Sequence, residues 1–182
     1  MTRRLLTRAL AVTGTAAALA LATTGNASAI VNGSAAAEGA YPFMASLQDG
    51  TGFAFCGGSV IASNWVLTAA HCVPDGDASD LYVVTGRTDL SDTSKGQRIK
   101  VDAVHVNPQY ADSAHDSALL HLSVPTTAPA ITLAGAADDG LEAAGTPVTV
   151  TGWGDQTNTM GLTSTNQLRT ASSTTTGATS TS

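Results

Sequence analysis

Six short stretches of apolar or alternating sequence constrain the fold of this chain more than any other feature. Clusters of Gly, Asp, Ser and Pro separate them, for example at 49–52 (Asp-Gly-Thr-Gly) and 74–77 (Pro-Asp-Gly-Asp). Alternation with a period of two is typical of half-buried strands, and the stretches lack a clear helical period. The pattern predicts an all-β domain, either an antiparallel barrel or a sandwich. The expected strands are 42–47, 53–61, 65–69, 81–86, 97–106 and 117–122.

The sequence changes character after these stretches. Residues 123–145 are rich in Ala, Thr, Pro and Gly and are expected to form a connection. A new strand is expected at 147–152 (Pro-Val-Thr-Val-Thr-Gly), with 166–171 as a partner, before a Ser/Thr-rich tail. We therefore expect a first β-domain over 30–135 and the opening of a second over 136–182. Since that opening strand lacks most barrel partners, the segment from Thr146 onward is expected to be loosely held.

The first 29 residues are typical of a secretory signal peptide. Arg3, Arg4 and Arg8 precede an apolar run at 9–22, and 27–29 (Ala-Ser-Ala) is a small-x-small cleavage pattern. The apolar run is too short to span a bilayer comfortably. The sequence predicts a secreted, extracellular protein whose mature chain begins at Ile30, by either general or twin-arginine export and with or without a short propeptide.

The charge balance argues against nucleic-acid and membrane partners. The whole sequence has 8 basic and 14 acidic side chains. Three of the basic residues lie within 1–29, so the remainder carries 5 basic against 14 acidic side chains and a net charge of −9. Such a surface repels nucleic acid and anionic lipid and favours solubility. We expect a monomer without either partner.

The chain has two cysteines, Cys56 and Cys72. In an exported protein an even count this low suggests one disulfide, and an oxidising exterior disfavours two free thiols. The bond would close a loop of about 17 residues and stabilise the fold by roughly 3 kcal/mol.

His71 is the first candidate for catalysis. It lies in 67–72 (Leu-Thr-Ala-Ala-His-Cys), at the end of an expected strand and beside Cys72. A histidine held in this way suits general-base chemistry, because proton transfer requires an imidazole fixed within hydrogen-bond reach of its target.

Three motifs carry a resemblance to a known family. Residues 30–33 (Ile-Val-Asn-Gly), 56–59 (Cys-Gly-Gly-Ser) and 68–72 (Thr-Ala-Ala-His-Cys) are similar to those of the trypsin and chymotrypsin family of serine proteases. Residues 151–154 (Thr-Gly-Trp-Gly) resemble the Gly-Trp-Gly that ends a strand at the start of the family's second barrel. The resemblance implies a secreted, bacterial-type member with a double β-barrel, of which this chain has the first barrel complete and the second only begun.

The resemblance also implies site residues. The family has an aspartate about 45 residues after its histidine, and Asp116, in 115–120 (His-Asp-Ser-Ala-Leu-Leu), stands at that spacing. His71 would act as the general base in the hydrolysis of polypeptide substrates, and a buried Asp116 would orient its ring. His115 stands where the family usually has Asn.

The family's nucleophile motif, Gly-Asp-Ser-Gly-Gly, does not occur in the 182 residues. We therefore expect a C-terminally truncated serine endopeptidase that ends before the nucleophilic serine and is inactive by itself. A non-catalytic secreted binding protein on the same shell is the alternative. It is disfavoured because such proteins usually replace the catalytic residues and retain the complete fold.

Two groups of aspartates raise the question of a metal. Asp75, Asp77 and Asp80, or Asp89 and Asp92, offer the oxygen ligands that calcium prefers, but neither group has a full ligand pattern. No cofactor is expected, and calcium remains a weaker alternative.

Overall fold

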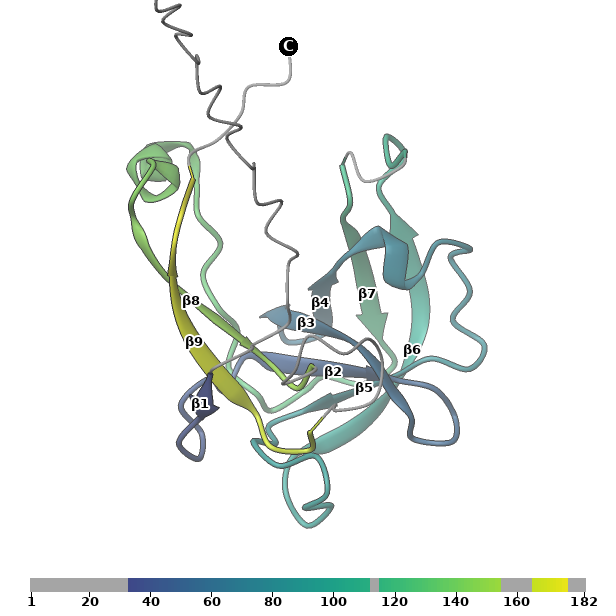
Figure 1. The fold of residues 1–182 in the computed structure, drawn as a ribbon. Helices are drawn as coiled ribbons and strands as arrows, with labels where there is room; N and C mark the ends of the chain where they lie inside the picture. The colour runs from purple at the N-terminus through teal and green to yellow at the C-terminus, as the bar shows by residue number, and fades with distance from the viewer. Residues whose placement is uncertain (1–32, 112–114, 155–164, 177–182) are drawn as a thin grey trace, which may run out of the picture.

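The computed structural model describes residues 33–111, 115–154 and 165–176, and six of its strands close into a barrel (Figure 1). All pairings around the barrel are antiparallel, in the order β2-β3-β4-β7-β6-β5. The all-β prediction is confirmed, as a barrel and not a sandwich. The barrel strands are β2 (Met44–Gln48), β3 (Ala54–Ala62), β4 (Trp65–Thr68), β5 (Tyr82–Thr85), β6 (Gln97–Val106) and β7 (Ala118–Leu122).

The strand bounds follow the expected stretches closely, because alternation in the sequence records which side chains face the barrel interior. The 97–106 stretch matches β6 at both ends, and the other five differ by no more than two residues. In β7, Leu120 and Leu122 point inward and are 0% and 1% exposed, while the intervening His121 lies on the outer wall. The largest fully buried side chains of this core are Leu47, Val60, Val66, Val83, Val101, Leu120 and Leu122.

A three-stranded sheet stands beside the barrel, in the order β1-β9-β8 (Figure 1). Strand β8 (Pro147–Gly152) has the expected bounds, and β9 (Arg169–Thr174) is its predicted partner, displaced toward the C-terminus. The two-residue strand β1 (Ser34–Ala35), which the sequence did not suggest, completes the sheet by pairing with β9. The expected connection contains a short 3-10 helix, η2 (Ala136–Glu142).

The second sheet is anchored at one end, which differs from the loose segment expected from the sequence. Trp153 and Leu168, 8% and 1% exposed, share a core with Met44, Val84 and Leu90 of the barrel side. The Trp153 indole also donates to the carbonyl of Thr88, at 3.2 Å. Packing and this hydrogen bond therefore hold one end of the second sheet against the barrel side.

The far ends of β8 and β9 extend away from the barrel (Figure 1). Val148 and Val150 on β8 are 36% and 47% exposed. Within the described residues, no strand pairs with the outer edge of β8. The same part of the chain contains no helix that is long and apolar enough to cross a membrane.

Truncation of Leu168 should show how much the shared core contributes. Leu168→Ala is expected to lower the free energy of unfolding by about 2–5 kcal/mol, because it leaves a cavity in a closed core. Val150→Ala, on the exposed part of β8, should cost less than about 1 kcal/mol. Urea unfolding of the oxidised chain measures both, and equal losses would contradict the anchoring role of Leu168.

Candidate active site

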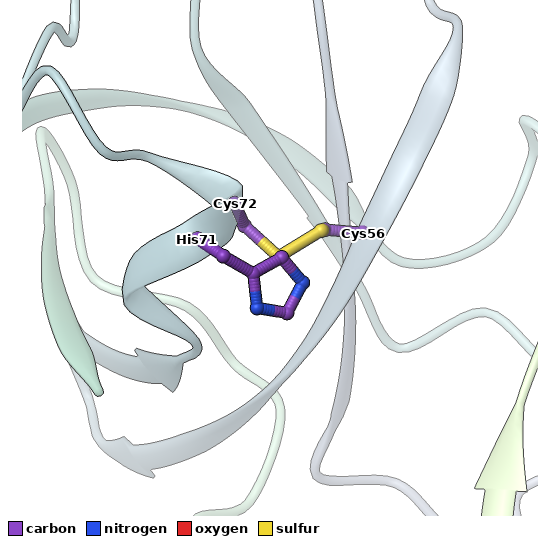
Figure 2. Close-up of side chains that lie close together, drawn as sticks. All are labelled: Cys56, His71 and Cys72. Carbon is purple, nitrogen blue, oxygen red and sulfur yellow. A yellow bond between two sulfur atoms is a disulfide. The ribbon is translucent and has the colours of Figure 1, made fainter. Parts of the chain in front are cut away.

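The predicted disulfide is present and connects two elements of the barrel. Cys56 lies in β3, and Cys72 ends a one-turn 3-10 helix, η1 (Ala70–Cys72), which follows β4. Their Sγ atoms are bonded, so η1 is tied to the barrel wall on both sides: by β4 and by the disulfide. His71 is the middle residue of η1, and Figure 2 shows its imidazole beside the disulfide.

Close packing of β3 on β4 supports this arrangement. A Cβ atom at Gly58 would lie 2.8 Å from the carbonyl oxygen of Leu67 and 2.9 Å from a methyl of Val66. A side chain at this position would push the strands apart, so Gly58 of the 56–59 motif has a structural role. Thr68 adds a hydrogen bond from its hydroxyl to the carbonyl of Gly57, at 2.8 Å.

The antiparallel pairing of β4 with β7 brings the two predicted site residues together. Thr68, the last residue of β4, is opposite Ala118, the first of β7. The residues just after β4 therefore meet those just before β7. His71 and Asp116, 45 positions apart in the sequence, become neighbours in this way.

Asp116 contacts His71 through both of its carboxylate oxygens. His71 Nδ1 lies 2.7 Å from Asp116 Oδ2, and the backbone N–H of His71 donates to Oδ1 at 2.9 Å. The carboxylate is acceptor only, so Nδ1 is the protonated ring nitrogen and Nε2 is left as an acceptor. The contact thus selects one tautomer and fixes the orientation of the ring.

The hydrogen bond from the His71 side chain, followed by that from its backbone, lowers the pKa of Asp116 below its ordinary value. The carboxylate is therefore ionised throughout the neutral range. Asp116 is half-buried, at 26% side-chain exposure, and His71 is 62% exposed. The expectation of a buried carboxylate is corrected here, because Asp116 lies in the turn ahead of β7 and not within the strand.

His115 has a left-handed backbone conformation, with φ of 53°. Few side chains adopt this region, but Asn, Asp and His are several-fold enriched there. This accounts for His at a position where the resembled family usually has Asn, because both tolerate the turn that leads into Asp116.

Three of the five aspartates considered for calcium, Asp77, Asp89 and Asp92, accept hydrogen bonds within their own loops. Ser79 donates its N–H and its hydroxyl to Asp77, and Ser91 does the same to Asp89. Hydrogen bonds from these serines lower the pKa of both aspartates, mainly through the Ser79 N–H and the Ser91 hydroxyl respectively. The contacts add nothing in favour of a calcium site.

A second His–Asp pair, which the sequence did not suggest, lies on the outer wall of the barrel. His121 Nδ1 and Asp102 Oδ1 are 2.6 Å apart, and Asn64 Nδ2 lies 3.3 Å from His121 Nε2. The pairing of β6 with β7 shifts by one residue between Val101 and Ala103, which makes Asp102 the extra residue of a β-bulge. A bulge leaves no periodic pattern in the sequence, so the sequence could not predict that His121 and Asp102 are neighbours.

Comparison with known proteins decides the family. The family model described as Trypsin matches residues 30–182, most of the chain. The chain belongs to the trypsin family. A trypsin from Saccharopolyspora erythraea is 41% identical over 128 residues, which cover 69% of this chain and 56% of the relative. Serine protease SP24D from Anopheles gambiae is 40% identical over 129 residues, covering 69% of this chain and 46% of the relative.

The fold agrees with this membership. The solved structure of the VesB protease from Vibrio cholerae superposes with a TM-score of 0.68 at 35% identity. The match covers 80% of this chain and 44% of the VesB chain. This trypsin-family chain thus spans about half the length of the relatives that it matches, in keeping with one complete barrel and part of a second.

Removal of the imidazole should raise the pKa of Asp116. In His71→Ala the ring hydrogen bond is lost while the backbone N–H remains, so we expect the pKa to return only part of the way to its ordinary value. Carboxyl ¹³C NMR titration measures it. The folded pKa is lowered, so the contact stabilises the fold above the unfolded pKa and is lost as pH falls through the folded one.

The second His–Asp pair provides the control for this titration. His121→Ala removes the equivalent ring from Asp102 and should leave the pKa of Asp116 unchanged. An unaltered Asp116 pKa in His71→Ala would contradict the role given to the imidazole.

Proposed function

We propose that this chain is the part of a trypsin-like serine endopeptidase that supplies the catalytic histidine and aspartate. The observation that carries the proposal is the two-point contact between Asp116 and His71, which leaves Nε2 unprotonated on a largely exposed ring. An imidazole prepared in this way can accept the proton of a nucleophile that approaches Nε2.

The proposed reaction is peptide-bond hydrolysis by acyl transfer. His71 takes the proton of a serine hydroxyl as it attacks the scissile carbonyl and then returns the proton to the leaving amine. Asp116 keeps Nδ1 protonated and stabilises the imidazolium that forms in between. Polypeptides are the substrates, and a segment with the nucleophile and the oxyanion-hole amides is required in addition to the 182 residues.

We propose that residues 30–135 form the first barrel domain and that residues 136–182 form part of a second barrel. The sheet that holds β8 and β9 also recruits β1 from the start of the first segment. Residues 1–29 act as the export signal in this proposal and Ile30 as the mature N-terminus. Both lie outside the described residues.

The chain by itself is expected not to hydrolyse peptides. Loss of the serine alone costs on the order of a million-fold in kcat in enzymes of this type, and their residual activity depends on the oxyanion hole. Turnover of a peptide substrate by the purified chain, abolished by His71→Ala, would contradict the proposal.

A form extended by the serine-bearing segment should be active and should depend on Asp116. Asp116→Asn is expected to lower kcat by roughly 10⁴-fold, because the amide favours the wrong tautomer of His71. His121→Ala serves as the matched control and should leave kcat unchanged. An Asp116→Asn variant as active as the parent would reject the assigned role.

Export should release a chain that begins at Ile30. Cleavage after the small-x-small pattern at 27–29 removes the basic and apolar segments together. N-terminal sequencing of the secreted protein tests this directly, and a start upstream, for example at Thr23, would indicate a propeptide instead.

A further inference from the structure

The segment 33–36 is attached to the second sheet at both of its ends. At its start, Nη2 of Arg169 donates to the carbonyl oxygen of Gly33, 136 positions away in the sequence. At its end, the backbone N–H of Ala36 donates to the carbonyl of Leu168, at 2.8 Å. Strand β1 lies between these two contacts and pairs with β9, beside which it stands in Figure 1. Both ends of the segment are therefore fixed by residues in or next to β9.

The register of the sheet places Arg169 for this contact. Arg169 is opposite Ala35 of β1 and Gly152 of β8, so it lies on the middle strand. Gly33 is buried, and a buried carbonyl needs a hydrogen-bond donor. A guanidinium is a strong donor, because a hydrogen bond from a charged group exceeds one between neutral groups. The Arg169 side chain therefore fixes the backbone at Gly33, one residue before β1 begins.

The other donors of Arg169 do not explain why an arginine stands here. Its Nε is buried without a hydrogen-bond partner, and it is the one such side-chain atom in the part of the chain that the structure describes. Within the same residues, Arg169 forms no ion pair with a carboxylate. An unpaired buried N–H destabilises a fold, so an apolar side chain of similar length would avoid that cost. The contact with Gly33 is what the arginine adds at this position.

Gly33 follows closely on Ile30, the mature N-terminus in the proposed function. Three residues of fully extended chain span at most about 11 Å. An α-amino group released at Ile30 is therefore confined to within that distance of the carbonyl that Arg169 holds. The contact itself needs no free amino group, because it is formed in the chain that still carries residues 1–29.

We propose that Arg169 is a positioning residue that anchors the start of the mature chain on the second sheet, before and independently of the removal of residues 1–29. Processing then frees an amino group that is already confined, and it does not have to bring the segment 33–36 to the sheet. The choice of Ile30 as the freed residue rests on the proposed function. The anchor at Gly33 does not depend on that function.

Amide hydrogen exchange within 33–36 tests the anchor. The full 182-residue chain is compared, with its disulfide intact, to Arg169→Met, which keeps a long side chain and removes the donors. We expect exchange within 33–36 to become about 10–100-fold faster, because a hydrogen bond from a charged group is lost beside a two-residue strand. Arg87→Met is the matched control, since Nε of Arg87 also donates to a backbone carbonyl, that of Lys95, at 2.7 Å. Its exchange within 33–36 should equal that of the parent chain.

Global stability separates a positioning role from a merely structural one. Arg169→Met removes the unpaired buried N–H together with the bond to Gly33, and these two losses oppose each other in the stability of the whole chain. The urea midpoint should therefore move much less than in Leu168→Ala. A midpoint lowered as much as in Leu168→Ala would show that the segment opens with the whole fold, and would overturn the proposal. Exchange in Arg169→Met at the parent rate would overturn it as well.

The same exchange measurement on the form released by export tests whether docking precedes processing. Equal protection of 33–36 in the unprocessed and the released chain, lost in both on Arg169→Met, supports the proposal. Protection that arises only after residues 1–29 are removed would overturn it. A released chain that starts at Thr23 instead of Ile30 would contradict the proposed mature N-terminus and leave the anchor at Gly33 intact.

Discussion

The pairing of β4 with β7 is the interaction on which the site depends. These strands join the segment β2-β3-β4 to the segment β5-β6-β7, so their register both closes the barrel and sets what lies at its ends. At one end it places His71 against Asp116. At the other end, His121 of β7 is opposite Trp65 and contacts Asp102 of the neighbouring strand. A shift of one residue would reverse the faces of β7 and expose Leu120 and Leu122.

The short helical turn η1 follows β4 and holds His71 where it meets Asp116. With three residues, η1 has little stability of its own, and it is held by the buried Ala70, the disulfide and the carboxylate of Asp116. The same restraints leave the His71 ring largely exposed, with Nδ1 against Asp116 and Nε2 3.5 Å from Cys72 Sγ. A rigid backbone with an accessible imidazole is what general-base chemistry requires.

The second sheet is packed against the barrel at one end only. Trp153 and Leu168 bury their side chains against the barrel, and this packing holds one end of β8 and β9. Val148 and Val150 at the other end remain exposed, as does the outer edge of β8 within the described residues. One end of the sheet is therefore packed against the barrel, and the other end is exposed to solvent.

The sequence by itself determined the strands, the disulfide and the candidate pair. Alternating side chains mark strands because the barrel has one wet and one dry face, and two cysteines allow one intramolecular bond. The motif around His71 and the spacing from His71 to Asp116 resemble those of the family, and this resemblance predicted the two site residues. Two contacts between residues that are distant in the sequence left no pattern from which to predict them. They are the contact of Asp102 with His121, which a β-bulge brings about, and the packing of Trp153 on the barrel. Only the tertiary structure decided those, and with them the half-burial of Asp116 and the approach of His71 Nε2 to Cys72, because each arises where separate strands meet.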